Sequence, residues 1–249
     1  MPLLSVITAA HPGRTDLLIE AGESLATQQL PAGWEVEWLL QEDGELGVLR
    51  AVSDRFDFAR YDSVSTQLGI AVTRNLALTR ARGELVHALD SDDLLLPHAV
   101  ATAIEAFEAR PQIHWVSGQA DDLLPDGTRV PYPPLIGPGL IEPGVVDRHM
   151  AEVGLPPIAC PGLTMRTTTV RMLGGWAANP RWEDSALFAG LAALTPGWVT
   201  DTVTWLYRQH DGQTTRGPEW THLQAELWEM VMQRSRAALE LAPFLRYAG

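Results

Sequence analysis

The chain has 249 residues, 46% of them hydrophobic, so it can bury a sizeable core as one α/β domain or as two tightly joined halves. Its net charge of −13 at pH 7, with no cluster of lysine and arginine, argues against nucleic acid as a partner. The single cysteine, Cys160, excludes an internal disulfide and a cysteine-based metal cluster, and we expect it to be a small buried residue.

Strand and helix patterns alternate over the first part of the chain. A buried strand is predicted over Leu3–Ala10, and after a turn the apolar residues of Asp16–Gln29 recur at helical spacing. A second strand, Val36–Leu40, runs into Glu42 and Asp43, and the glycine behind them indicates a turn. The sequence therefore predicts a β-α-β start with acidic residues at the end of a strand.

A further helix is predicted over Ala71–Ala81. Val72, Leu76 and Thr79 form one helical stripe, and Arg74 lies on the opposite side. Taken alone, an arginine in that position is typical of a solvent-exposed charge.

The stretch ELVHALDSDDLLLP contains the next predicted strand, Leu85–Leu89, and the start of another helix at Pro97. Val100, Ile104 and Phe107 supply the buried face of that helix. Alternation of this kind predicts a mainly parallel sheet with helices on both faces. Such sheets bind ligands beyond the carboxyl ends of their strands, which is where the acidic residues are expected.

The second half of the chain begins with a loss of pattern. Proline and glycine are frequent over Leu123–Gly162 and periodicity is absent, which indicates a functional loop region. The segment GLTMRTTTVRMLGGW then predicts a strand, a short helix and a turn, and RWEDSALFAGLAAL predicts a helix with Glu183 and Asp184 at its front end. GWVTDTVTWLYRQH predicts a strand that ends at His210, and one or two amphipathic helices are predicted over Trp220–Leu245.

The strand Leu85–Leu89 leads directly into three carboxylates, Asp90, Asp92 and Asp93. Asp90 and Asp92 are one residue apart, so both can reach one hard cation through oxygen ligands. Mg²⁺ takes one or two protein carboxylates and fills its other positions with water and phosphate oxygens, and Mn²⁺ suits the same donors. Alternatively, the aspartates form a solvated turn that caps the next helix, which is the interpretation we favour for Asp93. The triplet alone does not decide between these two interpretations.

Several motifs in order resemble the inverting family 2 glycosyltransferases with a GT-A fold. The motifs are LLSVITAA, the acidic strand end at Glu42 and Asp43, VTRNLALTRARGELVHALDSDDLLLP, LGGW, WEDSALF and YRQHDGQTT, and they extend from Leu3 to Thr215. The resemblance implies a GT-A-like (Rossmann-like) α/β fold, in which a mainly parallel sheet is flanked by helices in a single domain with a C-terminal helical segment.

The resemblance also implies a division of the chain and an activity. We expect a catalytic domain over residues 1–218, with a nucleotide-binding half (1–100) and an acceptor-side half (101–218), and a helical segment over 219–249 packed on it. The implied activity is that of a metal-dependent inverting glycosyltransferase, of the hexosyltransferase class. It would move a sugar from a UDP-, dTDP- or GDP-sugar donor to a hydroxyl of an acceptor saccharide or small molecule, with Mg²⁺ or Mn²⁺ as cofactor.

The donor-side roles follow the family's motifs residue by residue. By resemblance, Asp43 contacts the nucleotide base, Thr8 offers backbone contacts to the nucleotide, and Arg74 lies near it. Asp90 holds the ribose and shares in metal binding, and Arg216 could close over the diphosphate. The family often has two aspartates at the second strand end, and the glutamate in the first of these positions weakens the expectation of base selectivity.

The remaining roles concern the metal and the base. By resemblance, Asp92 and Asp90 bind the metal, His210 lies near the metal or the diphosphate, and Asp184 is the catalytic base, with Glu183 as the next candidate. The chemistry requires a stabiliser for the departing diphosphate and a base for the acceptor hydroxyl. Asp184 could instead favour the start of a helix through the helix dipole. His210 could equally be a structural histidine in a turn.

Two other function classes stay open. A non-catalytic nucleotide-sugar or carbohydrate-binding module would keep Asp43 and Asp92 without a base, yet Asp184 is present. A sugar nucleotidyltransferase would need a glycine-rich basic loop after the first strand, where this chain has only Gly13 and Arg14. Transfer of a glycosyl group is therefore the favoured activity.

Four tryptophans of the second half, Trp176, Trp182, Trp198 and Trp205, could stack against a sugar, although such residues are more often part of a core. No apolar run approaches the roughly 20 residues that a membrane-spanning helix needs, and no basic region precedes the first apolar segment. We therefore expect a cytoplasmic protein without a transmembrane segment. A homodimer is compatible with the sequence, which does not define the oligomeric state.

Overall fold

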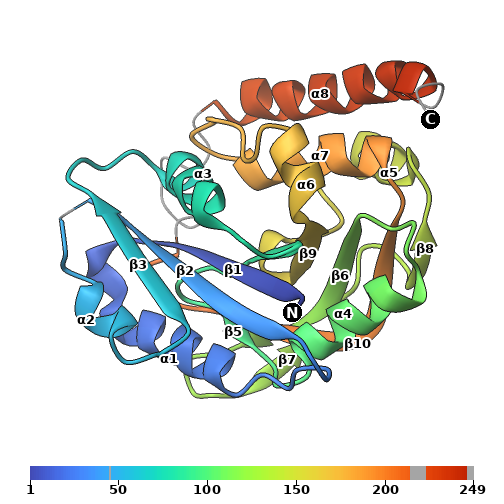
Figure 1. The fold of residues 1–249 in the computed structure, drawn as a ribbon. Helices are drawn as coiled ribbons and strands as arrows, with labels where there is room; N and C mark the ends of the chain where they lie inside the picture. The colour runs from blue at the N-terminus through green and yellow to red at the C-terminus, as the bar shows by residue number, and fades with distance from the viewer. Residues whose placement is uncertain (45, 214–222, 246–249) are drawn as a thin grey trace.

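One sheet runs through the protein, and helices cover both of its faces (Figure 1). The computed structural model describes residues 1–44, 46–213 and 223–245, and within these ranges ten strands join the sheet. The strands are β1 (Leu3–Ala10), β2 (Glu35–Asp43), β3 (Ala59–Val64), β4 (Leu85–Ala88), β5 (Leu94–Leu95), β6 (Trp115–Leu123), β7 (Arg129–Pro131), β8 (Gly139–Ile141), β9 (Leu163–Arg166) and β10 (Gly197–Arg208). The helices are α1 (Thr15–Ala26), α2 (Arg50–Ser53), α3 (Ile70–Arg80), α4 (Ala99–Ala109), α5 (Val145–Val153), α6 (Thr167–Met172), α7 (Glu183–Leu194) and α8 (Gln224–Leu245), with 3-10 turns η1 (Pro12–Arg14) and η2 (Cys160–Gly162).

The direction of the strands confirms the predicted, mainly parallel sheet. The order is β3-β2-β1-β4-β9-β6-β10-β5, with β7 paired to β6 and β8 to β10. β1 to β4 are parallel to one another, β6 is parallel to β10, and β9 lies antiparallel between β4 and β6. Because β9 reverses direction on both sides, β10 points the same way as β1 and β4. The carboxyl ends of β1, β2, β4 and β10 therefore lie at the same edge of the sheet.

Each face of the sheet has its own hydrophobic core. On one face, α1, α2 and α4 pack around Trp38 and Phe107. On the other, α3, α5, α6, α7 and α8 pack around Trp115, Trp176 and Phe188. This arrangement confirms that helices cover both faces, and it holds the strand ends at a fixed spacing.

The helix predicted over Ala71–Ala81 is present as α3, but its buried face differs from the predicted stripe. Thr79 is exposed, Val72 and Leu76 are only half-buried, and the buried side chains include Ala77 and Leu78. The stripe was assigned from helical spacing alone, whereas the buried side of α3 also carries the polar residues Thr73 and Arg74.

The predicted loop region Leu123–Gly162 contains more structure than expected. β7, β8, α5 and η2 all lie within it, and β3 and β6 elsewhere were also not predicted. β7 and β8 have three residues each, which is too short for a period-two pattern to be recognised. β3 is the edge strand of the sheet, and it alternates between exposed and half-buried residues, so it lacks the apolar run of a central strand.

The predicted C-terminal helical segment is present as α8, which packs against α7 (Figure 1). In the described part of the chain, no helix has both the length and the apolar sequence needed to cross a membrane. The division into a nucleotide-binding half, an acceptor-side half and a terminal segment stays a prediction.

A tight contact between β6 and β10 yields a first test of the fold. Gly197 opens β10 opposite Trp115, and a Cβ atom on Gly197 would lie 2.0 Å from ring atoms of that tryptophan. Trp115 is fully buried and packs edge-on against Phe188 at 5.1 Å, so it has little room to move. We expect Gly197→Ala to lower the free energy of unfolding by about 1–3 kcal/mol through overpacking.

Urea denaturation followed by circular dichroism measures this loss. Gly137→Ala is the control, because Gly137 has an ordinary backbone conformation and no atom within 4 Å of the added methyl group. Its stability should change little. Equal stability of the two variants would contradict the proposed packing of β10 on β6.

Candidate active site

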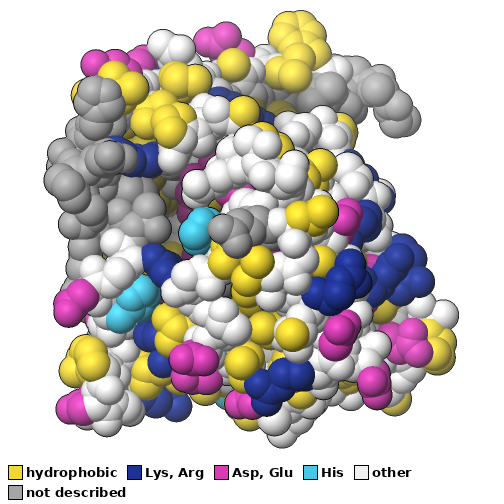
Figure 2. All heavy atoms as spheres, turned by 90° about the vertical axis from the view of Figure 1, so that its left-hand side faces the viewer, with side chains coloured by type: hydrophobic (Ala, Val, Ile, Leu, Met, Phe, Trp, Pro, Cys, Tyr) yellow, Lys and Arg dark blue, Asp and Glu magenta, His cyan; other side chains and the backbone are white. Residues whose placement is uncertain are grey.

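Acidic side chains gather at the edge where the parallel strands end. Asp43 is the last residue of β2, Asp90 and Asp92 follow β4, and His210 follows β10. The side of the molecule shown in Figure 2 is hollowed near its centre, where acidic side chains and a histidine lie below the surrounding surface. The fold therefore brings together residues that are far apart in the sequence.

Asp92 is held by groups from two other segments. Its Oδ2 atom accepts a hydrogen bond from Nη1 of Arg14 at 2.5 Å and lies 3.0 Å from Nε2 of His210. Arg14 also donates to the carbonyl oxygen of Gly212. The loop after β1 and the loop after β10 thus meet at this one carboxylate. His210 is a direct neighbour of Asp92, and the role of both residues in binding a metal stays a prediction.

The donor set around Asp92 fits a hard divalent cation that takes most of its ligands from elsewhere. Asp92 and His210 lie side by side, whereas Asp90 is turned toward Arg74. Among the described residues, no group of three or more His, Cys, Asp or Glu side chains converges on one point. Mg²⁺ is commonly held by one or two protein carboxylates together with water and substrate phosphates, and Asp92 supplies one such carboxylate.

Arg74 is the centre of a second cluster. Its side chain is only 2% exposed, and it donates to Oδ1 of Asp90 through Nη2 and to Oε1 of Glu183 at 2.8 Å through Nη1. The alternative interpretation of Arg74 as a solvent-exposed charge is therefore wrong, and its predicted position near the nucleotide stays a prediction. A guanidinium can be buried here because two carboxylates compensate its charge.

Glu183 and Asp184 are neighbours with different surroundings. Glu183 is buried against Arg74, and burial, followed by the negative charge of Asp184, raises the pKa of Glu183 to about 7. Asp184 is half-buried, and its Oδ1 atom accepts hydrogen bonds from the backbone N–H and the hydroxyl of Ser185 at 2.6 and 3.2 Å. The more accessible of the two carboxylates is thus the one predicted to be the base.

Asp43 anchors the loop before α3. Its two carboxylate oxygens accept the backbone N–H groups of Leu68 at 2.6 Å and Gly69 at 2.9 Å, and Gly69 is the residue that precedes the helix. A carboxylate has further lone pairs, so these bonds leave capacity for a ligand. The contact between Asp43 and a nucleotide base stays a prediction.

Two polar residues of β1 and β2 have structural partners. The hydroxyl of Thr8 accepts a hydrogen bond from the indole of Trp38 at 2.9 Å, and Thr8 is fully buried. Oε2 of Glu42 accepts bonds from Tyr61 and from the backbone of Leu49, both at 2.7 Å. The side chain of Thr8 faces the core, and the predicted contact between its backbone and a nucleotide stays a prediction.

Asp93 has a role that the sequence did not indicate. The interpretation that it caps the helix after Pro97 is wrong, because α4 begins at Ala99 without a side-chain cap. Oδ1 of Asp93 accepts the backbone N–H of Arg208 at 2.9 Å, which ties the loop after β4 to β10. Burial, followed by the charge of Asp90, raises the pKa of Asp93 well above its ordinary value.

The sequence did not predict the contact between Arg14 and Asp92. Arg14 received no role in the predicted site, although its place just after β1 puts it at the same edge as the other strand ends. Arg216, predicted to close over a diphosphate, lies outside the described residues.

Comparison with known proteins identifies the family. The family model described as glycosyl transferase family 2 matches residues 5–132, which is half of the chain. The chain belongs to glycosyl transferase family 2. The matched residues include the β4 end and its aspartates, Asp90 and Asp92, whereas Asp184 and His210 lie beyond them.

Curated relatives of this family 2 chain are much longer. It is 28% identical to the O-antigen biosynthesis protein RfbC of Myxococcus xanthus over 221 residues. The aligned region covers 85% of this chain and 16% of RfbC. It is 30% identical to the uncharacterized protein y4gI of Sinorhizobium fredii (strain NBRC 101917 / NGR234) over 131 residues. The aligned region covers 51% of this chain and 14% of y4gI. The chain therefore spans only 16% and 14% of the lengths of these two relatives.

Crystal structures of S. aureus TarS 1–349 share the fold. Each covers 97% of this chain at 18% sequence identity, and 70–71% of the TarS chain is covered in return. The TM-score is 0.68 for TarS 1–349, 0.69 for its complex with UDP and 0.71 for its complex with UDP-GlcNAc. This likeness confirms the predicted GT-A fold of the family 2 chain.

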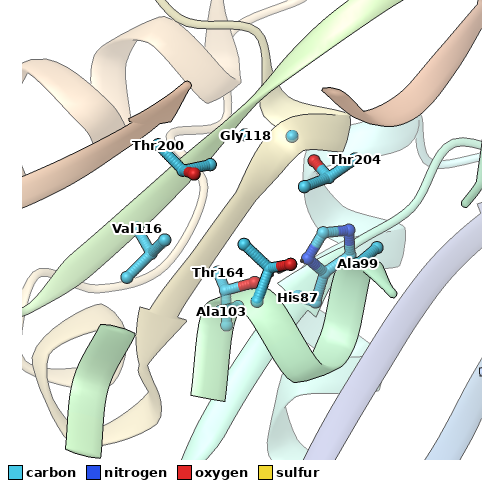
Figure 3. Close-up of a pocket in the computed structure, with 10 residues that line it drawn as sticks. His87, Ala99, Ala103, Val116, Gly118, Thr164, Thr200 and Thr204 are labelled. Atoms are coloured by element: carbon cyan, nitrogen blue, oxygen red, sulfur yellow. Dashed lines mark hydrogen bonds between the residues drawn. The ribbon is translucent and has the colours of Figure 1, made fainter. Parts of the chain in front are cut away.

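A small internal cavity of the family 2 domain is separate from these clusters (Figure 3). It lies between the sheet and α4, where His87 of β4 and Thr164 of β9 point toward each other with Nδ1 and Oγ1 2.8 Å apart. Burial lowers the pKa of His87 to about 4, so the ring is neutral at pH 7. The cavity volume of about 10 Å³ is that of a single water molecule, which excludes a nucleotide or a sugar.

Replacement of Arg74 tests the buried ion-pair cluster. Arg74→Met should lower the free energy of unfolding by about 3–5 kcal/mol at pH 7.5, because two buried or half-buried carboxylates lose their compensating charge. The loss should shrink toward pH 5. Without Arg74 the pKa of Glu183 rises further above its unfolded value, so the folded variant takes up a proton earlier and regains stability as the pH falls.

Urea denaturation at the two pH values measures both effects. Arg55→Met is the control, because Arg55 forms an ion pair with Glu23 in which both side chains are about half exposed. Such a pair contributes at most about 1 kcal/mol. A loss for Arg74→Met that is small or independent of pH would show that the cluster is not held as described.

Proposed function

We propose that this chain is a metal-dependent inverting glycosyltransferase that moves a sugar from a nucleoside-diphosphate donor to an acceptor hydroxyl. The observation that carries the proposal is the position of Arg74 between Asp90 and Glu183. It joins the acidic segment after β4, predicted to bind the donor, to the carboxylate pair that starts α7, predicted to supply the base. The proposed donor site and the proposed base would thereby lie at the edge of one sheet.

The donor side of the proposal starts from Asp92. Asp92 and His210 would hold Mg²⁺ or Mn²⁺, whose charge would stabilise the departing diphosphate. Arg14 already donates to the same oxygen of Asp92, so it has to move when a cation binds there. A diphosphate offers Arg14 a new anionic partner. Such an exchange of partners would couple the binding of the metal to the binding of the nucleotide.

The acceptor side of the proposal rests on Asp184. Its carboxylate would accept the proton of the acceptor hydroxyl while that oxygen forms the new bond to the sugar and the bond from the sugar to the diphosphate breaks. One base and no carboxylate nucleophile suffice for a single displacement, which inverts the configuration at the anomeric carbon. Glu183, buried against Arg74, would position the start of α7.

The nature of the substrates is proposed by likeness. TarS structures contain UDP and UDP-GlcNAc, so a uridine nucleotide is the first donor to test, with dTDP- and GDP-sugars next. The relative RfbC is named for O-antigen biosynthesis, so we propose a saccharide as the acceptor. The cytoplasmic location and the homodimer stay predictions.

A first experiment concerns the metal. UDP should bind more tightly in the presence of Mn²⁺ or Mg²⁺, and Asp92→Ala should abolish this gain, because Asp92 reaches the diphosphate only through the ion. Isothermal titration calorimetry with and without metal measures the difference. Asp62→Ala is the control, since Asp62 lies in the edge strand β3 and its side chain is 59% exposed. A metal effect of equal size in wild type and Asp92→Ala would remove Asp92 from the metal site.

A second experiment separates binding from chemistry. Asp184→Asn should keep the fold and the affinity for nucleotide, because the amide is nearly isosteric and still forms hydrogen bonds. It cannot accept a proton at neutral pH, so release of UDP from a UDP-sugar in the presence of saccharide acceptors should fall by on the order of 10² to 10⁴. If Asp184 only favours the start of α7, the variant would lose about 1 kcal/mol of stability at most and keep its turnover.

Glu183→Gln serves as the comparison within the site. If the activity falls with Glu183→Gln and survives Asp184→Asn, the base is Glu183 and the assignment above is reversed. Nucleotide affinity that collapses in Asp184→Asn would show that Asp184 belongs to the donor site.

A further inference from the structure

An open groove lies beside the starts of α7 and α8. Its volume is about 470 Å³, and its lining includes Trp182 from the start of α7, Trp228 and Glu226 from the first turns of α8, and Gly154 at the end of α5. Sites for small molecules commonly have volumes of about 300–1,000 Å³. The groove is therefore large enough for a substrate, unlike the internal cavity near His87.

Two tryptophan rings form an aromatic corner in this groove. The ring centres of Trp182 and Trp228 are 5.4 Å apart and the planes are inclined by 64°, so the rings meet edge to face. Both side chains are half-buried, which leaves part of each ring at the surface. An aromatic corner of this kind presents two apolar faces at an angle, in contrast to Trp115 and Trp176, which are entirely within the core.

The backbone of Trp182 has an unusual conformation. It precedes α7 with φ 59° and ψ 22°, in the left-handed region, which bulky residues rarely adopt. Its carbonyl oxygen accepts the N–H of Ala186 at 2.8 Å, so the residue is fixed to the first turn of the helix. Strained backbone of this kind is concentrated at binding and catalytic sites. Here it sets the direction in which the indole leaves the helix.

The groove reaches the residue that precedes the predicted catalytic carboxylates. Trp182, at the N-cap of α7, lines the groove and is followed directly by Glu183 and Asp184, which are not among the lining residues. An acceptor hydroxyl has to come within about 3 Å of the base, and the rest of the acceptor must then lie on the surface around the first turn of α7. The groove supplies such a surface.

The lining favours a neutral, hydroxyl-bearing ring. Gln224 and Glu226 are exposed and offer an amide and a carboxylate, groups that hydrogen-bond to hydroxyls. Among the lining residues that the structure describes there is no lysine or arginine, so nothing there would compensate a phosphate or carboxylate of a ligand. Apolar faces of a sugar ring pack on aromatic rings while its hydroxyls take the polar groups.

We propose that this groove binds the acceptor as a neutral saccharide, with one sugar ring against Trp182 and Trp228 and its hydroxyls toward Glu226. The proposal rests on the proposed glycosyltransferase function for the identification of the ligand as an acceptor. The groove as a saccharide site can be tested without any transfer reaction.

The test follows the indole N–H signals of the protein by nuclear magnetic resonance during titration with neutral sugars. Glucose, galactose, mannose, rhamnose and N-acetylglucosamine are each added to high millimolar concentration. The signals of Trp182 and Trp228, assigned with Trp182→Phe and Trp228→Phe, should shift with at least one sugar. The signal of Trp34 should stay in place, because its indole donates to Glu108 away from the groove.

Three variants measure how much Trp182 and Glu226 contribute to the binding of the sugar. Trp182→Ala should weaken the binding of that sugar by about tenfold, as expected for the loss of an aromatic face, while Trp182→Phe keeps most of it. Glu226→Gln, at an exposed position where folding is not at risk, should also weaken it. UDP affinity in the presence of Mn²⁺, measured on the same variants, should not change.

The outcomes are distinct. If UDP binds but no neutral sugar shifts either indole signal, the groove proposal is overturned and the proposed function stands. If a sugar shifts both signals but no nucleotide binds, the saccharide site is supported and the transferase function is overturned. Glucose 1-phosphate that binds more tightly than glucose would overturn the choice of a neutral ligand.

Discussion

A buried arginine between two carboxylates is the contact on which the arrangement of the site depends. The chain carries a net charge of −13, and the ends of its strands collect several carboxylates at one edge of the sheet. Without a cation, Asp90, Glu183 and Asp184 would repel one another in a poorly solvated region. Arg74 compensates two of them with separate nitrogen atoms, which a guanidinium can do and a lysine ammonium cannot do with the same geometry. It also fixes α3 to the start of α7, 109 residues further along the chain.

A second arginine, Arg14, forms another ion pair at the same edge of the sheet. It pairs with Asp92 and bonds to the backbone after β10, so loops from the beginning and from the later part of the chain are tied to the acidic segment after β4. The two arginines differ in burial: Arg74 is 2% exposed and Arg14 is 31% exposed at the side chain. Arg74 is thus suited to a permanent structural role, whereas Arg14 has access to solvent.

Part of this arrangement follows from the sequence and part does not. The alternation of buried strands and amphipathic helices predicted the parallel sheet, because long periodic segments such as β1 and α4 carry strong patterns. The acidic strand ends were predicted for the same reason, since the carboxyl ends of parallel strands face the ligand side of such a sheet. The partners of each carboxylate could not be predicted, because they come from loops whose geometry depends on the whole fold.

Arg74 and Asp93 show why pattern alone misleads at this edge. The buried face of a helix is predicted from its apolar residues, so an arginine outside that face is expected in solvent. The partner of Arg74, Glu183, is distant in the sequence, so the local pattern does not indicate a buried ion pair. Asp93 stands just before a helix and fits a cap by position, yet its partner is the backbone of Arg208 in a distant strand. In both cases a contact over a long sequence separation overrides the local preference.

The start of α7 shows how the fold assigns different properties to two adjacent carboxylates. Glu183 and Asp184 both stand in the first turn, where the helix dipole favours negative charge. Their mutual repulsion is relieved on one side only, because Arg74 reaches Glu183 and the side chain of Asp184 instead bonds to the adjacent Ser185. Glu183 is thereby held in the interior, whereas Asp184 is half-buried. A proton acceptor has to be accessible, and Asp184 is the more accessible of the two carboxylates, which favours it for the proposed role of the base.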